Sequence, residues 1–310
     1  MLANLGFDSV VITGPTASGK SDLAIKLTYL LKHKGIECFI INADSKQIYK
    51  EVPIITAQPS KADLQNAPHI LYGFYTNKDA IEQRYSVAKW FYAVKHEVEN
   101  LIAQKKMPII VGGSGFYIEA LVKGLSKIPS LDPLAAKISE DLFDSLGYET
   151  FLQKVLEIDP LTQRDPQRLK KNYSYITQYH KPLRLLDDGS REVIELNPIK
   201  FVLIPPRESI YKECDSRFDD MCKDGVIEEV EDLIKQEESI ADAIFTTSGF
   251  KYIVEFLQGK ITKQIMLEKS KQETRNYGKR QSTWFNNRFK DCGFIFAGSK
   301  NDILTQKFFN

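Results

Sequence analysis

The sequence of 310 residues has few of the residues that bind metals or form disulfides. It contains four cysteines and four histidines, and both kinds are scattered along the chain. Cys38, Cys214, Cys222 and Cys292 form no C-x-x-C pair, and their spacing matches neither a disulfide framework nor a zinc site. We therefore expect reduced cysteines and no metal centre built from cysteine and histidine.

Long hydrophobic runs are also missing. No apolar stretch approaches the roughly 20 residues that a membrane-spanning helix needs. The first eight residues lack the basic start and apolar core of a signal peptide. The sequence contains no internal repeat and no low-complexity tract. With 43% hydrophobic and 27% charged residues, the composition is that of a globular domain, so we expect a soluble, cytoplasmic monomer with no membrane partner.

The charge is unevenly distributed, although the formal net charge is only +1. Most ionisable residues in the segments 164–191 and 260–290 are basic, whereas those in the segment 213–242 are mostly acidic. Basic blocks in a chain that is balanced overall are typical of proteins that hold an anionic partner on one face.

One segment matches the phosphate-binding loop G-x-x-x-x-G-K-[ST]; it consists of Gly14, Pro15, Thr16, Ala17, Ser18, Gly19, Lys20 and Ser21. An apolar run precedes it and a helical pattern follows, as this motif requires. The backbone N–H groups of such a loop point at phosphate oxygens. Lys20 adds a positive charge, and the Ser21 hydroxyl is placed to hold Mg²⁺. The loop predicts a ligand with at least two phosphates.

Strands and helices alternate along most of the chain, which predicts a parallel sheet. Expected strands are 37–42, 69–74, 108–111, 200–204 and 293–296, and expected helices include 85–104, 210–222 and 262–288. We interpret 246–251 as a turn and the acidic stretch after 222 as a solvated helix face. Ligands bind beyond the carboxyl ends of parallel strands, so Asp44 should face the phosphate loop. A role as a turn or N-cap carboxylate suits Asp44 as well.

The strand at 108–111 ends in Gly112 and Gly113. ATPases of this class usually carry an acidic residue at such a strand end, where it completes the magnesium and water site. Its absence argues against nucleotide hydrolysis.

Between residues 129 and 198 the pattern changes to short amphipathic helices. We therefore predict an α/β core with a P-loop NTPase-like parallel sheet flanked by helices, formed by 1–128 and 199–310, and an all-helical insertion at 129–198. Basic residues in the insertion alternate with Tyr173, Tyr175 and Tyr179. This mixture suits single-stranded RNA, since cations bind phosphates and rings stack on bases. Tyrosines in a small helical core with solvated lysines explain the pattern equally well.

Further segments occur in a fixed order: 43–50 (ADSKQIYK), 56–59 (TAQP), 67–69 (APH), 85–88 (YSVA), 111–117 (VGGSGFY), 165–168 (DPQR), 217–221 (RFDDM), 248–252 (SGFKY) and 274–285 (TRNYGKRQSTWF). Together with the phosphate loop, they resemble the tRNA dimethylallyltransferases, also called tRNA isopentenyltransferases. The resemblance extends over the whole chain. The sequence departs from the family pattern at Pro53, Ile55, Gln58 and Ala136.

This resemblance implies a reaction. Such enzymes transfer a prenyl group from dimethylallyl diphosphate to the exocyclic amine of the adenine on the 3′ side of the anticodon in tRNA. Pyrophosphate leaves, and Mg²⁺ assists. By this resemblance, Asp44 takes the amine proton, while Lys20 and Arg217 stabilise the charge on pyrophosphate.

The resemblance also implies contacts with the anticodon loop of tRNA. The residues expected to make them are Asp44, Ser45, Lys46, Gln47, Ser114, Gln167, Arg168, Leu169, Lys170, Lys171, Ser248, Gly249, Phe250, Lys251, Arg275, Lys279 and Arg280.

Two other functions fit parts of the sequence. A small-molecule or nucleoside kinase could use the same phosphate loop, but it would leave the basic helices unexplained. A non-catalytic RNA-binding protein descended from the transferases would bind tRNA and transfer nothing. Incubation with labelled dimethylallyl diphosphate, unmodified tRNA and magnesium distinguishes all three.

Overall fold

The computed structural model describes residues 6–306, and the chain divides into two compact units. We call the unit formed by Met1–Val122 and Ile194–Asn310 the core unit, and Lys123–Val193 the insertion. Both limits of the insertion differ by a few residues from the expected 129 and 198. Within residues 6–306, no helix is both long and apolar enough to cross a membrane.

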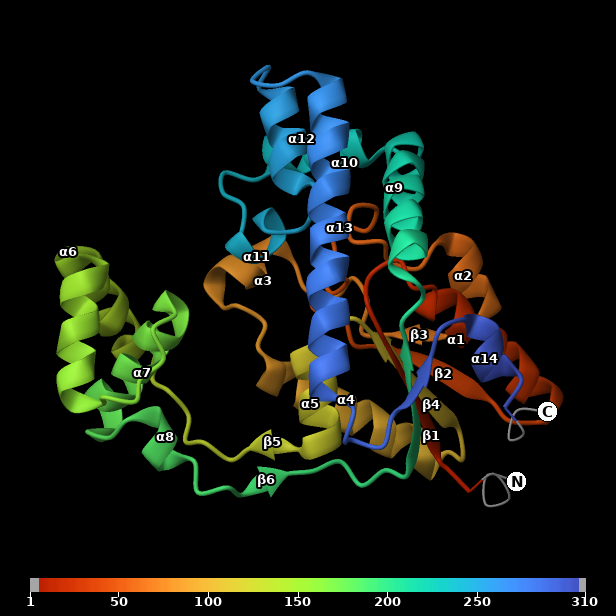
Figure 1. Cartoon of the computed structure of the whole chain (residues 1–310), viewed down its shortest axis with the longest axis horizontal. Coiled ribbons are helices and arrows are strands. Elements are labelled where there is room, and N and C mark those ends of the chain that lie inside the picture. The colour runs from red at the N-terminus through yellow and green to blue at the C-terminus, as the bar shows by residue number, and fades with distance from the viewer. Residues whose placement is uncertain (1–5, 307–310) are drawn as a thin grey trace. The chain divides into compact units, whose positions relative to one another are not determined.

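A six-stranded parallel sheet forms the centre of the core unit (Figure 1). Its strands are β1 Ser9–Thr13, β2 Cys38–Asn42, β3 His69–Ile70, β4 Met107–Gly112, β7 Pro198–Leu203 and β8 Ile295–Ala297. Their order across the sheet is β3-β2-β4-β1-β7-β8, so β1 lies between β4 and β7. The expected parallel α/β sheet is therefore confirmed.

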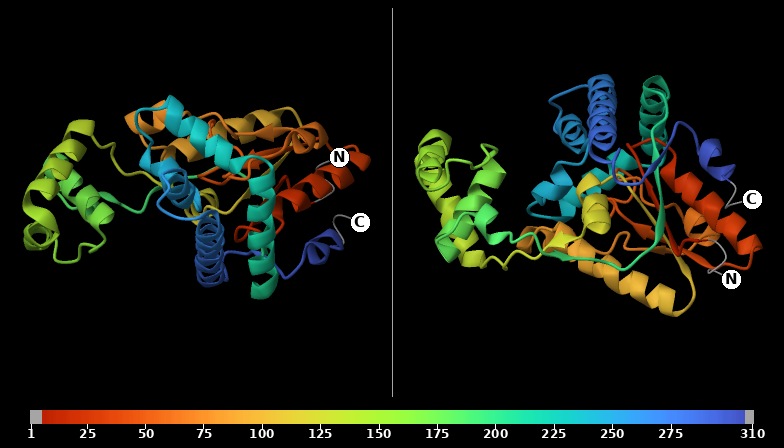
Figure 2. Two further views of the ribbon diagram at one scale, coloured as in Figure 1. Left: turned by 90° about the horizontal axis from the view of Figure 1, so that it is seen from above. Right: turned by 60° about the horizontal axis from the view of Figure 1, so that its bottom comes forward.

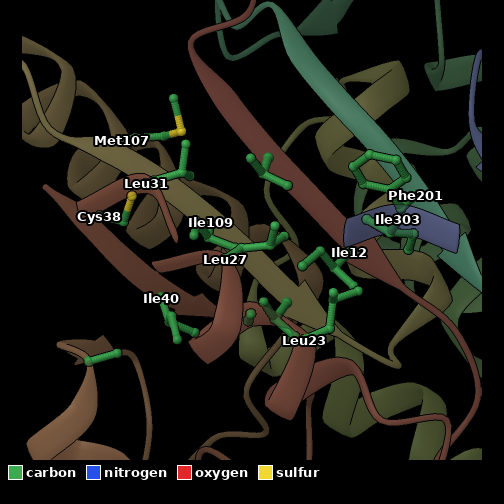
Figure 3. Close-up of a cluster of buried hydrophobic side chains, with 14 of the residues drawn as sticks. Ile12, Leu23, Leu27, Leu31, Cys38, Ile40, Met107, Ile109, Phe201 and Ile303 are labelled. Atoms are coloured by element: carbon green, nitrogen blue, oxygen red, sulfur yellow. The ribbon is translucent and has the colours of Figure 1, made fainter. Parts of the chain in front are cut away.

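Helices cover both faces of this sheet: α1 Lys20–His33, α4 Val87–Ala103, α5 Gly115–Lys123 and α14 Lys300–Leu304. On one face, Leu23 and Leu27 of α1 are fully buried with Ile12, Ile40 and Ile109 of the strands (Figure 3). Alternation along the strands directs their neighbours in sequence to the opposite face. There α4 packs against β4, and it lies across the sheet from α1 (Figure 2).

A helical layer lies beyond the carboxyl ends of the strands: α9 Arg207–Lys223, α10 Val226–Gln236, α11 Asp242–Phe245, α12 Phe250–Leu257 and α13 Lys263–Arg288. The short helices α2 Lys61–Asn66 and α3 Asn77–Glu82 complete the core unit. This layer has its own apolar core, which includes Val52, Phe218, Val230 and Met266. The expected turn at 246–251 was partly wrong, because Phe250 begins a helix and is fully buried.

The insertion contains α6 Pro133–Ile158, α7 Pro166–Tyr179 and α8 Leu183–Leu186. Helix α6 is broken at Gly147, whose φ is 71°. Phe151, Val155, Leu169 and Ile176 form its small core. The expected helical insertion carries one addition, an antiparallel pair of strands, β5 Leu125–Ser126 and β6 Arg191–Glu192, at its two ends.

Candidate active site

The phosphate loop connects β1 to α1, and two of its glycines have positive φ, 149° at Gly14 and 88° at Gly19. A Cβ on Gly14 would overlap the carbonyl of Leu203. Gly19 is the N-cap of α1, and no side chain in the described part of the chain caps this helix. The first N–H groups of α1 are therefore free to bind an anion.

Two partly buried cations reach this loop. Lys20 Nζ donates to the carbonyl of Pro15 at 2.6 Å, and Arg217 of α9 donates to Thr16 Oγ1. Burial lowers the pKa of Lys20 to about 8, although the nearby Asp44 acts in the opposite direction. Burial also lowers the pKa of Arg217. The loop thus concentrates positive charge that is poorly solvated, and a bound polyanion would stabilise it.

Asp44 lies directly beyond β2, as predicted. Its backbone N–H donates to Asn42 Oδ1 at 2.7 Å, and its Oδ1 accepts from the N–H of Lys46 at 2.9 Å. One carboxylate oxygen therefore stabilises the turn after β2, in agreement with the alternative interpretation of Asp44 as a turn carboxylate. Burial lowers the pKa values of Lys20, Lys46 and Arg217, and the negative charge of Asp44 partly opposes this lowering in all three.

Two cavities meet at Asp44. The first, of about 400 Å³, is lined by the phosphate loop together with Asp22, Glu213 and Asp220 among others. The second, of about 300 Å³, is lined mainly by the helical layer, including Phe218, Thr247, Ser248, Tyr277 and Arg280. Both are lined by Thr16, Asp44, Thr56 and Arg217. A group bound at the phosphate loop and a second group could therefore approach each other at this carboxylate.

Glycines at the end of β4 explain why an acidic residue is missing there. A Cβ on Gly112 would overlap the backbone of Ala43, and one on Gly113 would lie 2.7 Å from Gln281 Nε2. The backbone directly beyond β2 leaves no space for a side chain at Gly112, and a side chain at Gly113 would displace the amide of Gln281.

Gln281 of α13 was not among the predicted site residues, yet it connects two loops of the site. Its Oε1 accepts from the N–H of Thr16 at 2.7 Å, and its Nε2 donates to the carbonyl of Gly113 at 2.8 Å. The side chain is buried. The only signal in the sequence was an uncharged amide within the basic segment 274–285.

Several residues expected to bind tRNA lie beside the second cavity. Lys46, Ser248 and Arg280 line it, and Lys46 Nζ donates to the carbonyl of Ala243 at 2.6 Å. Ser114 Oγ accepts from the N–H of Ser45 at 2.8 Å. Gln47 belongs to the same group, and its amide donates to the carbonyls of Thr56 and Ala57. Lys251 and Lys279 are exposed, and Gly249 is the N-cap of α12.

Two of the expected residues have side chains that pack in apolar cores. Leu169 and Phe250 are both fully buried. Nη1 of Arg275 forms an ion pair with both carboxylate oxygens of Asp215, at N–O distances of 2.6 and 2.7 Å. Its guanidinium therefore joins α13 to α9 in this structure.

Within the insertion, Gln167, Arg168 and Lys171 are exposed on α7. Lys170 instead pairs with Glu140 and lies over the ring of Phe143. Tyr175 is buried, and its hydroxyl donates to the carbonyl of Pro129 at 3.2 Å. The interpretation of tyrosines as part of a small helical core thus holds for Tyr175.

The fold and the site define an α/β protein with a phosphate loop, in which partly buried cations and carboxylates surround a polar cavity. A family model described as IPP transferase matches residues 47–288. The chain belongs to this family.

Curated relatives match nearly the whole chain. It is 37% identical over 300 residues to the tRNA dimethylallyltransferase of Ehrlichia chaffeensis, and the match covers 95% of both chains. It is 38% identical over 296 residues to that of Wolbachia pipientis subsp. Culex pipiens, covering 94% of this chain and 96% of the relative.

Solved structures share the fold. The full-length tRNA isopentenylpyrophosphate transferase of Bacillus halodurans is 25% identical with a TM-score of 0.65, over 94% of this chain and 89% of the other. A eukaryotic dimethylallyltransferase acting on tRNA is 22% identical with a TM-score of 0.76, over 97% of this chain and 76% of the other. The latter likeness supports the fold alone.

Lys20→Ala and Ser21→Ala should each weaken binding of inorganic pyrophosphate, because each removes a polar contact from the phosphate loop. We expect about 1.5–3 kcal/mol for Lys20 and less for the neutral Ser21. Titration calorimetry measures the effect, with Lys32→Ala, an exposed lysine on the same helix, as the control. Wild-type affinity in both variants would show that the loop binds no diphosphate.

Gln281→Met should lower the free energy of unfolding by about 1–3 kcal/mol, because Thr16 N–H and the Gly113 carbonyl lose a buried partner. Chemical denaturation measures this, with Gln264→Met on the exposed face of α13 as the control. Pyrophosphate affinity should fall as well, since Thr16 is no longer held. Equal stability of the two variants would mean that this connection contributes nothing.

Proposed function

We propose that this protein transfers a dimethylallyl group from dimethylallyl diphosphate to the exocyclic amine of the adenine on the 3′ side of the anticodon in tRNA, releasing pyrophosphate. The observation that carries the proposal is the meeting of the two cavities at Asp44 and Arg217. The first offers cations and helix N–H groups to a diphosphate. The second offers the rings of Tyr277 and Phe218 beside polar side chains, which suits a planar base.

The chemistry follows from these groups. The amine nitrogen forms a bond to the allylic carbon while the bond from that carbon to the diphosphate oxygen breaks. Negative charge grows on pyrophosphate, where Lys20, Arg217 and the N–H groups of the loop stabilise it. An adenine amine is a poor nucleophile because its lone pair is delocalised into the ring, so a proton must leave as the bond forms. Asp44 is the carboxylate at the junction that accepts it.

We further propose that Mg²⁺ serves as the cofactor. Among the described residues, no group of three or more histidine, cysteine, aspartate or glutamate side chains could hold a metal. Mg²⁺ suits such a site because it binds through one or two protein ligands, water and substrate phosphates. Ser21, Glu213 and Asp220 line the first cavity and could supply those ligands. When bound, the ion would neutralise charge on the diphosphate.

The partner in this proposal is the anticodon loop of tRNA, and the protein acts as a cytoplasmic monomer. Exposed basic residues support the partner: Arg164, Arg168, Lys171 and Lys181 in the insertion, and Lys279 and Arg280 on α13. Each of the two groups suits a polyanion with unstacked bases.

The proposed function is tested by incubation of the protein with labelled dimethylallyl diphosphate, unmodified tRNA and magnesium. Label in RNA, located by nuclease digestion at the adenine beside the anticodon, is the expected result. A parallel reaction with labelled ATP and nucleosides should yield no phosphorylated product. Phosphorylated nucleoside without labelled RNA would establish the kinase instead.

Asp44→Asn should lower kcat about 10²–10⁴-fold, because the amide keeps the acceptor for Lys46 N–H but cannot take a proton. The dissociation constants of donor and tRNA should change much less. Single-turnover kinetics with saturating tRNA measures the chemical step, and Asp232→Asn on the exposed surface of α10 is the control. Near-normal turnover would show that Asp44 only positions the turn.

The insertion should be removable at its strand pair. In the register of β5 and β6, Leu125 faces Glu192 and Ser126 faces Arg191, so Lys127 and Ser190 can flank a two-residue turn. Replacing residues 128–189 by Asn-Gly should weaken tRNA binding by about tenfold or more. Inorganic pyrophosphate should bind as before, which shows that the core unit is folded. Unchanged tRNA affinity in a filter-binding assay would place the RNA surface on the core unit.

A further inference from the structure

A second lysine lies against the phosphate loop, and it comes from the far end of the chain. Lys300 is the first residue of α14, beyond the segment 47–288 that the family model matches. A Cβ built on Gly19 would lie 3.2 Å from Cδ and 3.6 Å from Nζ of Lys300. The aliphatic part of the Lys300 side chain therefore lies against Gly19, the N-cap of α1, and its ammonium group lies close to the phosphate loop.

The fold holds this lysine in place. Ile303 of α14 is fully buried among residues of α1 and the sheet (Figure 3). Ser299 and Asp302 form a capping box at the start of α14, and β8, just before it, pairs with β7. Helix α14 lies beside α1 (Figure 1). The backbone of Lys300 is thus anchored on both sides, so only its side chain needs to move.

The partner of Lys300 is Asp22, which lines the first cavity. Asp22 also pairs with Lys26, at 3.1 Å. If Lys300 turned towards a phosphate oxygen, Asp22 would keep Lys26 as its partner. The Lys300 side chain is 37% exposed, so it is free to change rotamer. An exposed ion pair of this kind is worth little, and breaking it costs little.

We propose that Lys300 is a second lysine of the diphosphate site, and that its ammonium group moves from Asp22 to the phosphate oxygens when the donor binds. Asp22 also lines the first cavity, and its negative charge opposes a polyanion unless further positive charge is supplied. A flexible lysine supplies that charge as a point contact. This inference rests on the proposed function, in which the loop holds a diphosphate.

The test compares Lys300→Met with Lys26→Met in the full chain. Both variants remove one positive charge and one partner of Asp22, but only Lys300 lies over Gly19. Titration calorimetry with inorganic pyrophosphate and magnesium, without tRNA, should show affinity about 5–20-fold weaker in Lys300→Met. Lys26→Met should change it less than about twofold. Lys300→Arg should retain most of the affinity.

Steady-state kinetics adds a second measurement. In Lys300→Met the KM for dimethylallyl diphosphate should rise and the KM for tRNA should stay the same, with an unchanged melting temperature. Wild-type pyrophosphate affinity in a folded Lys300→Met variant, or equal losses in both methionine variants, would overturn the assignment of Lys300 while leaving the proposed function intact. Weaker pyrophosphate binding in Lys300→Met alone, in a protein that transfers no prenyl group, would uphold Lys300 and overturn the proposed function.

Discussion

The site depends on the burial of positive charge around the phosphate loop. Removing Lys20 and Arg217 from water disfavours their charged forms, and this is the largest cause of their lowered pKa values. The folded state holds a proton on Lys20 less tightly than the unfolded state, so this burial destabilises the fold at neutral pH, and the cost disappears only as pH rises from about 8 towards 10.5. Asp44 offsets part of the cost, and a bound diphosphate would offset more.

Close backbone packing at the carboxyl edge of the sheet is needed to bring Asp44 beside these cations. Asp44 can face the loop only if β2 and β4 end side by side, and at that point Gly112 leaves no space for a side chain. Gln281 then satisfies the N–H of Thr16 and the carbonyl of Gly113 together. The geometry that brings the Asp44 carboxylate to the phosphate loop therefore excludes an acidic side chain at Gly112, the end of β4.

Local patterns in the sequence were enough to predict the phosphate loop, the position of Asp44 and the long helix α13. They were not enough to predict contacts between distant segments, because periodicity contains no information about which helix meets which loop. Glu229 belongs to an acidic stretch expected to be solvated, yet it accepts from the N–H groups of Ile54 and Ile55, and burial raises its pKa to about 7. Burial of Leu169 was not predicted either: it directly follows the shared segment 165–168, and its side chain packs in the core of the insertion.

The segment 53–58 lines both cavities and contains three of the departures from the family pattern. Gln58, one of these departures, donates to the carbonyl of Tyr49 at 2.7 Å. Its amide thus stabilises the loop without adding charge. Positive charge for a diphosphate must then come from outside this segment, from Lys20 and Arg217. Lys300 is distant from both residues in the sequence. In space, its side chain also lies against the phosphate loop, at Gly19.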